Sequence, residues 1–341
     1  MRRCLDLAAL GMGKTAPNPM VGAVLVYDNR IIGEGYHQQY GKAHAEVNAI
    51  QSVPISQRHL MEHSTLYVSL EPCSHFGKTP PCTNLIIQHK IPRVVIACAD
   101  PFPKVSGSGI KQLQEAGVQV TVGILEEEAK HLNRKFMTFH TQQSPRVILK
   151  WAQTSDLFFA KTSDRQTWIS NEFSKTLVHK WRSEEQSIMV GYNTALTDNP
   201  QLNVRNWFGS SPMRIVLDEH LTLPKHLCLF DQSIPTLVIT GSSQPVQTSS
   251  GNLSFFQTPF DETLLPEIIS YLYRHGIQSL MVEGGKYLLD TLISQNLWHE
   301  ARIFTAPQRW GTGIPAPRLP ESAVLLDDTM IHTDRLQVWE N

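Results

Sequence analysis

The sequence has no surplus of charge of either sign and no long apolar run. Its 341 residues include 30 lysines and arginines and 31 aspartates and glutamates, so the formal net charge is −1. Proteins that hold a nucleic-acid backbone usually carry a basic surplus, so this balance disfavours a DNA or RNA partner. No stretch approaches the ~20 apolar residues that span a bilayer, and we therefore expect no membrane partner.

Cysteine is also scarce, with five residues in the chain, at positions 4, 73, 82, 98 and 228. A disulfide framework normally pairs an even number of cysteines in a short secreted chain. The odd count in a long chain instead predicts a reducing compartment, and we expect a cytoplasmic protein. Single cysteines usually serve as small packing residues, so a functional assignment needs a second signal.

The order of predicted elements indicates two domains of the α/β class. The chain is about two domains long, and a polar stretch at residues 141–145 marks the expected boundary. The domains would then span residues 1–143 and 144–341. Strands alternate with helices in both, which predicts mainly parallel sheets covered by helices on both faces.

Apolar periodicity and turn residues locate the individual elements. In the first domain we expect strands at 21–27, 31–34, 65–69, 93–99 and 118–122, and helices at 1–12, 44–53, 82–89, 110–116 and 125–141. In the second we expect strands at 147–153, 188–191, 214–217, 236–240, 279–283 and 303–305, and helices at 171–182, 264–275 and 286–295. The polar segment 242–251 is expected to be an exposed loop.

One part of the first domain combines zinc ligands with a carboxylate. His44 and Glu46 lie two positions apart, and Cys73 and Cys82 follow a predicted strand. One imidazole and two thiolates are three zinc ligands, and a catalytic zinc keeps its fourth position for a water that it acidifies. Glu46 is too near His44 to be a comfortable fourth ligand, but it is well placed to carry protons from the water to a leaving amine. This combination is typical of zinc-dependent nucleobase deaminases.

The spacing of the two cysteines departs from the general deaminase pattern. Eight residues separate Cys73 and Cys82, where two are usual. The alternative is that the three ligands are unrelated packing residues, but Glu46 and the strand before Cys73 favour zinc. The inserted loop contains polar and basic side chains that suit a substrate phosphate, namely Ser74, His75, Lys78 and Thr79.

Two glycine-rich turns carry weaker signals. The first, Gly107-Ser108-Gly109, lacks the third glycine of a dinucleotide-binding loop, and we expect a simple turn. The second, residues 282–286, runs from a strand through two glycines into a helix, where backbone N–H groups can bind a phosphate. Such a turn is more often only a turn, so the second domain has no self-sufficient chemical motif.

Longer motifs make a resemblance specific. Residues 15–24, 35–37, 44–46 and 71–82 together resemble the RibD family of riboflavin biosynthesis, a fusion of a pyrimidine deaminase and a reductase. The likeness implies a cytidine-deaminase-like α/β/α domain followed by a dihydrofolate-reductase-like α/β domain. It implies one zinc on His44, Cys73 and Cys82, with Glu46 as the catalytic residue. It also implies substrate contacts at Asn18, His37, His75 and Lys78.

The second domain shares looser motifs with the same family, at residues 150–152, 168–170, 198–205, 214–218 and 283–285. The resemblance implies that NADPH binds near Ala152, Trp168, Thr194, Asp198, Gly285, Lys286, Tyr287 and Leu288. It implies that the sugar phosphate binds near Arg182, Leu202, Arg205 and Glu283. The two arginines suit a phosphate by their chemistry alone.

One departure from the family concerns a loop after the first reductase strand. Where the family has Asp-Gly, this chain has Asp156-Leu157. Glycine in such a place often serves a positive φ, so we expect Leu157 to be left-handed and the reductase to be working but impaired.

The implied function is a two-step riboflavin-pathway enzyme. The first domain would remove the 2-amino group of 2,5-diamino-6-(5-phosphoribosylamino)pyrimidin-4(3H)-one, and the second would reduce the opened ribose with NADPH. Three alternatives stay open: a deaminase with an inactive scaffold domain, a nucleic-acid-editing deaminase, and a non-enzymatic zinc module. We also expect a homo-oligomer, either a dimer or a tetramer.

Overall fold

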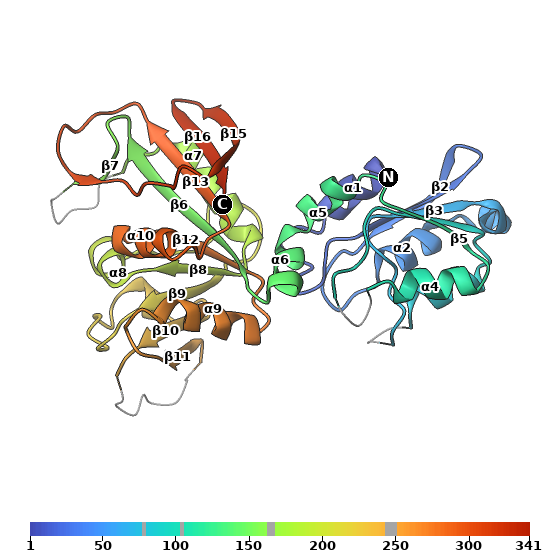
Figure 1. The fold of residues 1–341 in the computed structure, drawn as a ribbon, viewed down its shortest axis with the longest axis horizontal. Coiled ribbons are helices and arrows are strands. Elements are labelled where there is room, and N and C mark those ends of the chain that lie inside the picture. The colour runs from blue at the N-terminus through green and yellow to red at the C-terminus, as the bar shows by residue number, and fades with distance from the viewer. Residues whose placement is uncertain (77–79, 103–105, 162–167, 243–250) are drawn as a thin grey trace. The chain divides into compact units, whose positions relative to one another are not determined.

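The computed structural model describes residues 1–76, 80–102, 106–161, 168–242 and 251–341. The chain divides into two compact units, Met1–Gln143 and Ser144–Asn341 (Figure 1). Within the described residues, none of the helices is long and apolar enough to span a membrane.

The first unit is built on a five-stranded sheet in the order β2-β1-β3-β4-β5. Its strands are β1 (Gly22–Tyr27), β2 (Arg30–Tyr36), β3 (Thr65–Val68), β4 (Arg93–Ile96) and β5 (Gln119–Val122). Strand β1 is antiparallel to both β2 and β3, whereas β3, β4 and β5 are parallel. Asp28 and Asn29 join β1 to β2 with φ of 47° and 59°, the left-handed values that a two-residue hairpin requires.

Helices cover both faces of this sheet, as the sequence predicts. They are α1 (Arg2–Ala9), α2 (Ala45–Ser52), α3 (Cys82–Gln88), α4 (Ser108–Glu115), α5 (Glu126–Leu132) and α6 (Arg134–Gln142), with a 3₁₀ segment at Ile55–His63 that the sequence analysis did not foresee. Ala23 and Leu25 of β1 share a core with α2, α3 and α4, whereas Val24 packs with Leu7 of α1. Successive strand residues point to opposite faces, so β1 separates two cores.

Helix α2 lies very close to the sheet because Gly35 of β2 has no side chain. A Cβ at Gly35 would lie 2.5 Å from the backbone nitrogen of Ala49 in α2. Any larger residue would push the helix away. This close approach fixes the middle of α2 against β2. His44 is the N-cap residue of the same helix.

The expectation of one helix over residues 125–141 is wrong. The segment forms α5 and α6, and Asn133 between them has φ −98° and ψ 21°. The side chain of Asn133 is buried and hydrogen-bonded to the backbone of Met20. Asparagine side chains compete with helix hydrogen bonds in this way, and here the competing partner lies far away in the sequence.

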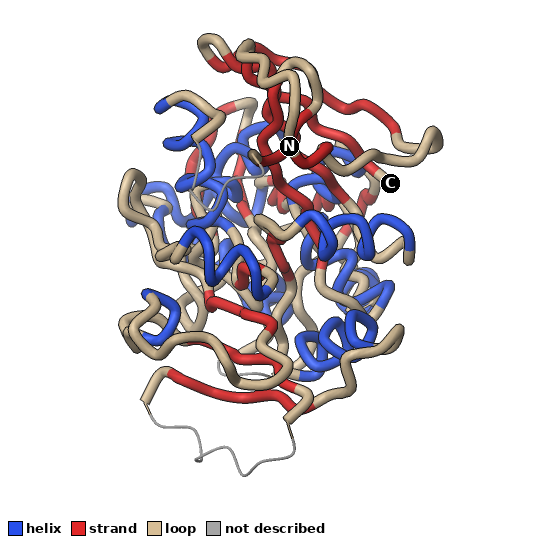
Figure 2. The backbone as a smooth tube through the Cα atoms, turned by 90° about the vertical axis from the view of Figure 1, so that its left-hand side faces the viewer, coloured by secondary structure: helices blue, strands red, loops and turns tan. Residues whose placement is uncertain are grey.

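The second unit contains a nine-stranded sheet in the order β11-β10-β9-β8-β12-β6-β13-β16-β15. Its strands are β6 (Arg146–Thr154), β8 (Ser187–Val190), β9 (Met213–Leu217), β10 (Thr236–Thr240), β11 (Leu253–Gln257), β12 (Ser279–Val282), β13 (Glu300–Ala306), β15 (Val324–Ile331) and β16 (Asp334–Glu340). The first seven strands of this order, from β11 through β13, run parallel to one another. Strand β16 is antiparallel to both β13 and β15. Figure 2 shows strands of this sheet in red with helices beside them.

Helices α7 (Glu172–Glu184) and α8 (Tyr192–Asp198) cover one face, and α9 (Leu264–Arg274) and α10 (Lys286–Ser294) cover the other. The mainly parallel sheet with helices on both faces is confirmed for the second unit. The sheet of the first unit is instead mixed, because β1 is antiparallel to both of its neighbours. Several elements were not predicted from the sequence: α8, β11, the β15–β16 hairpin, the 3₁₀ turn Cys228–Phe230, and the small sheet of β7 (Phe158–Ala160) and β14 (Ile314–Pro315). Most of the expected 242–251 loop lies outside the described residues.

Candidate functional sites

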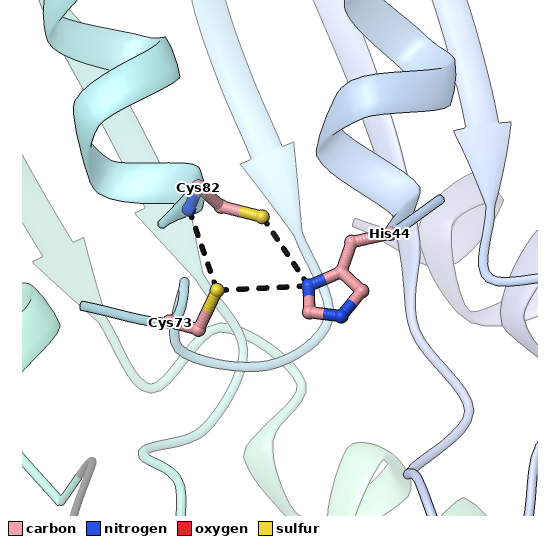
Figure 3. Close-up of side chains that lie close together, drawn as sticks. All are labelled: His44, Cys73 and Cys82. Carbon is pink, nitrogen blue, oxygen red and sulfur yellow. Dashed lines mark hydrogen bonds between the residues drawn. The ribbon is translucent and has the colours of Figure 1, made fainter. Parts of the chain in front are cut away.

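Three side chains of the first unit converge on one point (Figure 3). The Nδ1 atom of His44 lies 3.6 Å from Sγ of Cys73 and 3.4 Å from Sγ of Cys82, and all three donor atoms lie within 4.8 Å of one another. Zinc lies about 2.3 Å from sulfur and about 2.0–2.1 Å from nitrogen, which at a tetrahedral angle separates the donors by about 3.6 Å. The cluster therefore fits a zinc ion.

Two helix starts and one loop hold these ligands. His44 caps α2, Cys82 is the first residue of α3, and Cys73 lies in the loop that follows β3. The backbone N–H of Cys82 donates to Sγ of Cys73 at 3.3 Å, and both the N–H and the hydroxyl of Thr83 donate to the Cys73 carbonyl at 3.2 Å. The start of α3 thus holds both the side chain and the carbonyl of Cys73, although eight residues separate the two cysteines.

The local electrostatics prepare Cys73 for metal binding. Hydrogen bonds from Cys82 and His44 lower the pKa of the Cys73 thiol to about 4, so this sulfur is a thiolate at neutral pH. The hydrogen bond with Cys73, together with burial, raises the pKa of Cys82 well above its usual value. Thiolates are the ligands of zinc, so binding of the ion displaces the remaining thiol proton.

Glu46 lies in the first turn of α2, is only 4% exposed and interacts with the Cys82 thiol. Burial, followed by the negative charge of Cys73, raises the pKa of the Glu46 carboxyl to about 7. A carboxyl group with a pKa near neutrality can both accept and donate a proton, which is the property a proton shuttle needs.

Asn18 and His37 lie beside the zinc ligands. Nδ1 of His37 is 3.0 Å from the carbonyl oxygen of Ala43, and Nε2 is 3.2 Å from Nδ2 of Asn18. A carbonyl can only accept, so Nδ1 carries the hydrogen and Nε2 accepts from the Asn18 amide. The His37 ring meets the ring of His44 edge-on at 5.5 Å. His37 is only 2% exposed, and burial lowers its pKa, which favours the neutral form.

The other two expected substrate contacts lie in the loop between the cysteines. His75 is exposed. Lys78 lies outside the described residues. Their roles stay predictions.

Two buried carboxyl groups near this site were not singled out by the sequence analysis. Glu71 accepts hydrogen bonds from four backbone N–H groups that follow β4, namely those of Asp100, Gly107, Gly109 and Ile110. The start of α4 is thus occupied by the protein's own carboxylate. The segment Gly107-Ser108-Gly109 is not only a turn, because Gly107 is the N-cap residue of α4 and the other two residues begin the helix. Burial raises the pKa of Asp100 to about 6. Both carboxyl groups follow buried strands, and a polar residue in that position is a sequence signal from which they could have been found.

A buried group of charges lies in the second unit. Arg182 of α7 donates two hydrogen bonds of 2.7 Å to Glu283, which follows β12, and Nζ of Lys150 on β6 lies 3.8 Å from the same carboxylate. Burial alone would raise the pKa of Glu283, but Arg182 and Lys150 lower it to about 2. The pairing of Lys150 was not foreseen, because its partner Glu283 lies more than a hundred residues away in the sequence.

The segment from Leu202 to Arg205 adjoins these charges. The carbonyl oxygen of Asn203 accepts from Arg182 at 3.2 Å and lies 2.9 Å from Nδ1 of His179. Arg205 donates to the Asn203 side chain at 2.8 Å, and Leu202 is buried with φ of 50°. The structure thus brings Arg182, Glu283 and the Leu202–Arg205 segment together.

The glycine turn before α10 packs against Thr194. Gly284 and Gly285 have φ of 157° and 87°, and a Cβ at either position would lie 3.3–3.6 Å from the Thr194 side chain. Leu288 packs 3.6 Å from the same Cβ position of Gly285. The two glycines therefore let the turn pack closely against α8.

The remaining expected cofactor contacts have diverse surroundings. Ala152 lies on β6, and Asp198 ends α8, where burial raises its pKa. Lys286 pairs with Asp290 on α10, and Tyr287 is 86% exposed. Trp168 is 57% exposed, with Nζ of Lys175 4.3 Å from its ring centre. Their roles as cofactor contacts stay predictions.

The expected left-handed backbone at Leu157 is confirmed. Its φ is 66°, its N–H donates to the Thr154 carbonyl at 2.9 Å, and its side chain is 53% exposed. The carboxylate of the preceding Asp156 accepts from the backbone N–H groups of Trp310 and Gly311. The turn therefore keeps the geometry that glycine would adopt without strain.

The fold and the metal cluster define a zinc-binding deaminase domain joined to a second α/β domain. Residues 1–98 match the cytidine and deoxycytidylate deaminase zinc-binding region. Residues 145–334 match the RibD C-terminal domain, which covers more than half of the chain. The chain belongs to the RibD family of riboflavin biosynthesis proteins, and its likeness to known members extends over both domains.

The riboflavin biosynthesis protein RibD of Aquifex aeolicus is 39% identical over 316 residues, which are 92% of this chain and 88% of the relative. The RibD protein of Bacillus amyloliquefaciens is 39% identical over 326 residues, which are 94% of this chain and 86% of the relative. A crystal structure from Thermotoga maritima matches with a TM-score of 0.91 and 34% identity, covering 100% of this chain and 97% of that one. That protein is a diaminohydroxyphosphoribosylaminopyrimidine deaminase and 5-amino-6-(5-phosphoribosylamino)uracil reductase.

Proposed function

We propose that the chain catalyses two successive reactions of riboflavin biosynthesis. Residues 1–143 hydrolyse the 2-amino group of 2,5-diamino-6-(5-phosphoribosylamino)pyrimidin-4(3H)-one. Residues 144–341 then reduce 5-amino-6-(5-phosphoribosylamino)uracil to its ribityl product with NADPH. The observation that carries the proposal is the convergence of His44, Cys73 and Cys82 beside a buried Glu46. The activity of the Thermotoga relative supports the choice of substrates.

In the deamination, water adds to the ring carbon and ammonia leaves. Zinc on its three ligands supplies a Lewis acid that makes a water acidic near neutral pH. Glu46 accepts the proton that the water loses and delivers it to the departing amine, a role that its buried position in the first turn of α2 suits. The Asn18 carbonyl, oriented by His37, is an acceptor for a donor group of the substrate.

In the reduction, NADPH supplies the hydride that the C1 carbon of the opened ribose accepts. The protein's contribution is to align donor and acceptor and to hold the phosphate. Glu283 fixes the guanidinium of Arg182, and Arg205 adds a second, more exposed guanidinium. The Gly284-Gly285 turn offers backbone N–H groups at the start of α10 to an anionic cofactor.

The decisive experiment incubates the purified protein with the diaminopyrimidine, with and without NADPH, and identifies the products by mass spectrometry. The proposal expects the deaminated uracil without NADPH and the ribityl product with it. Deamination alone in both samples would make the second domain an inactive scaffold. Unchanged substrate in both samples would contradict the proposed function as a whole.

We expect Arg205→Ala to raise KM for the reductase substrate by about 10–100-fold, because a charge-assisted hydrogen bond to phosphate is lost. Deamination should stay unchanged, since Arg205 belongs to the other unit. The measurement is NADPH oxidation over a range of substrate concentrations, with Arg274→Ala, an exposed arginine of α9, as the matched control. Equal damage to both activities would instead indicate general destabilisation or a wrong division of the chain.

We expect Leu157→Gly to raise the reduction rate or tighten NADPH binding several-fold. A left-handed leucine costs roughly 1–2 kcal/mol, which is small beside a domain stability of ~5–15 kcal/mol but shifts a local loop equilibrium about tenfold. NADPH oxidation and thermal-shift titration with NADPH measure the effect. Leu125→Gly, which relieves a second left-handed leucine in the first unit, is the control. If neither the parent nor Leu157→Gly oxidises NADPH, and NADPH raises the melting temperature of neither, the second domain is an inactive scaffold.

We also propose that the protein works as a homo-oligomer in the cytoplasm. The edge strand β15 exposes several apolar side chains, including Val324 at 59% and Met330 at 59%, which would gain from burial by another subunit. Light scattering after size-exclusion chromatography measures the mass in solution. A monomer at working concentration would contradict this part of the proposal.

The reducing cytoplasm suits a zinc site that depends on two thiolates.

A further inference from the structure

Asn133 interrupts a helix in order to hold a distant loop. Its side-chain oxygen accepts from the Met20 N–H at 2.8 Å, and its side-chain nitrogen donates to the Met20 carbonyl at 2.9 Å. Both residues are buried, and 113 positions separate them in the sequence. An amide is the side chain that offers one donor and one acceptor side by side, so Asn133 satisfies both backbone groups of Met20 at once.

The segment around Asn133 rests firmly on the sheet. Ala129 of α5 and Phe136 of α6 pack with Leu70, Ala97 and Cys98. Leu70 follows β3 and precedes Cys73, and the other two directly follow β4. The broken helix thus provides a fixed support at the carboxyl ends of the strands from which the site's loops emerge.

The loop that Asn133 holds at Met20 also contains Asn18. Residues 13–20 contain turns and no helix or strand, and a backbone hydrogen bond from Asn18 to Thr15 closes one of these turns. The amide of Asn18 then donates to His37, and His37 donates to the carbonyl of Ala43, which precedes the zinc ligand His44. The loop is therefore attached to Asn133 at Met20 and to His37 at Asn18, and near its start the carbonyl of Lys14 accepts from the Tyr40 N–H at 3.1 Å.

We propose that Asn133 is a positioning residue for the deamination. It fixes the backbone at Met20, and thereby sets where Asn18 presents its side-chain carbonyl to the substrate. The inference rests on the proposed function, because it assigns Asn18 to the substrate of the first domain. Asn133 itself contacts neither the zinc ligands nor, in this assignment, the substrate.

The first test is Asn133→Ala. Loss of one well-placed hydrogen bond to the substrate corresponds to about a tenfold rise in KM for the diaminopyrimidine, with a smaller effect on kcat. Bound zinc and the NADPH-dependent reduction, both measured on the same full-length sample, should match the parent. Asn133→Asp keeps the acceptor for the Met20 N–H but cannot donate as a carboxylate, so its KM should fall between those of the parent and Asn133→Ala.

A double-mutant cycle separates positioning from general destabilisation. If Asn133 acts through Asn18, the effect of Asn133→Ala should largely disappear in a protein that already carries Asn18→Ala. The KM of the double variant should then exceed that of Asn18→Ala by less than about twofold. Ser64→Ala removes another buried side-chain hydrogen bond of the same unit, at the amino-terminal end of β3, and serves as the matched control. It should lower the melting temperature without changing KM.

Three results would overturn the inference. They are an unchanged KM in Asn133→Ala, full additivity with Asn18→Ala, and an equal rise of KM in Ser64→Ala. Each is distinct from failure of the proposed function, which would appear as no deamination by the parent protein.

Discussion

Replacement of Glu46 by glutamine is expected to slow deamination by ~10²–10⁴-fold, the usual contribution of a general acid–base group. Glutamine keeps the size and much of the hydrogen bonding of Glu46, but it cannot accept a proton from water. The buried position of Glu46 in the first turn of α2 and its interaction with Cys82 make it the best-placed proton carrier beside the zinc ligands. Zinc content should stay at the parent value, because Glu46 is not a ligand.

Initial rates of ammonia release and metal analysis of the same samples test this expectation. Glu62→Gln, a change of the same kind at an exposed residue of the 3₁₀ segment, should leave the rate unchanged. NADPH oxidation by the second domain provides an internal control for folding. Near-normal turnover by Glu46→Gln would assign the proton transfer to another group, with His75 as the next candidate.

The second large effect concerns the metal itself. The parent protein should hold about one zinc per chain, and Cys82→Ser should lose most of it, because a serine hydroxyl does not replace a thiolate ligand. Deamination should be lost with the metal. The effect should also depend on pH: zinc binding displaces the proton that the raised pKa of Cys82 retains, so affinity should fall as the pH is lowered.

Cys98→Ser is the matched control for Cys82→Ser. Cys98 is buried in the same unit, and burial raises its pKa to about 12, so it is a thiol at neutral pH and lies outside the metal cluster. Zinc content measured by atomic emission after dialysis should be normal in this variant. Full zinc retention by Cys82→Ser would show that the long spacing between the cysteines had been wrongly interpreted as a metal motif.

The sequence was sufficient for features with local causes. The ligands His44, Cys73 and Cys82 follow from residue type and spacing, and the strands that precede them follow from short apolar runs. The left-handed backbone at Leu157 followed from a missing glycine. Each of these depends on neighbours within a few residues, which a pattern can capture.

Features with distant partners could not be predicted. The break at Asn133 depends on Met20, and the charges of Lys150 and Arg182 are balanced by Glu283, which follows a strand formed much later in the chain. The β15–β16 hairpin escaped notice for another reason. Nearly every side chain of β15 is exposed, so its sequence lacks the alternation that indicates a half-buried strand.

The chain passes only once from the first unit to the second, between Gln143 and Ser144, and each unit has its own apolar core. Among the described residues, no strand of one sheet comes from the other half of the polypeptide. The fusion is therefore modular: a mutation can lower or raise the activity of one domain without disturbing the packing of the other. What the fusion guarantees is equal dosage, since every translated copy delivers one deaminase and one reductase.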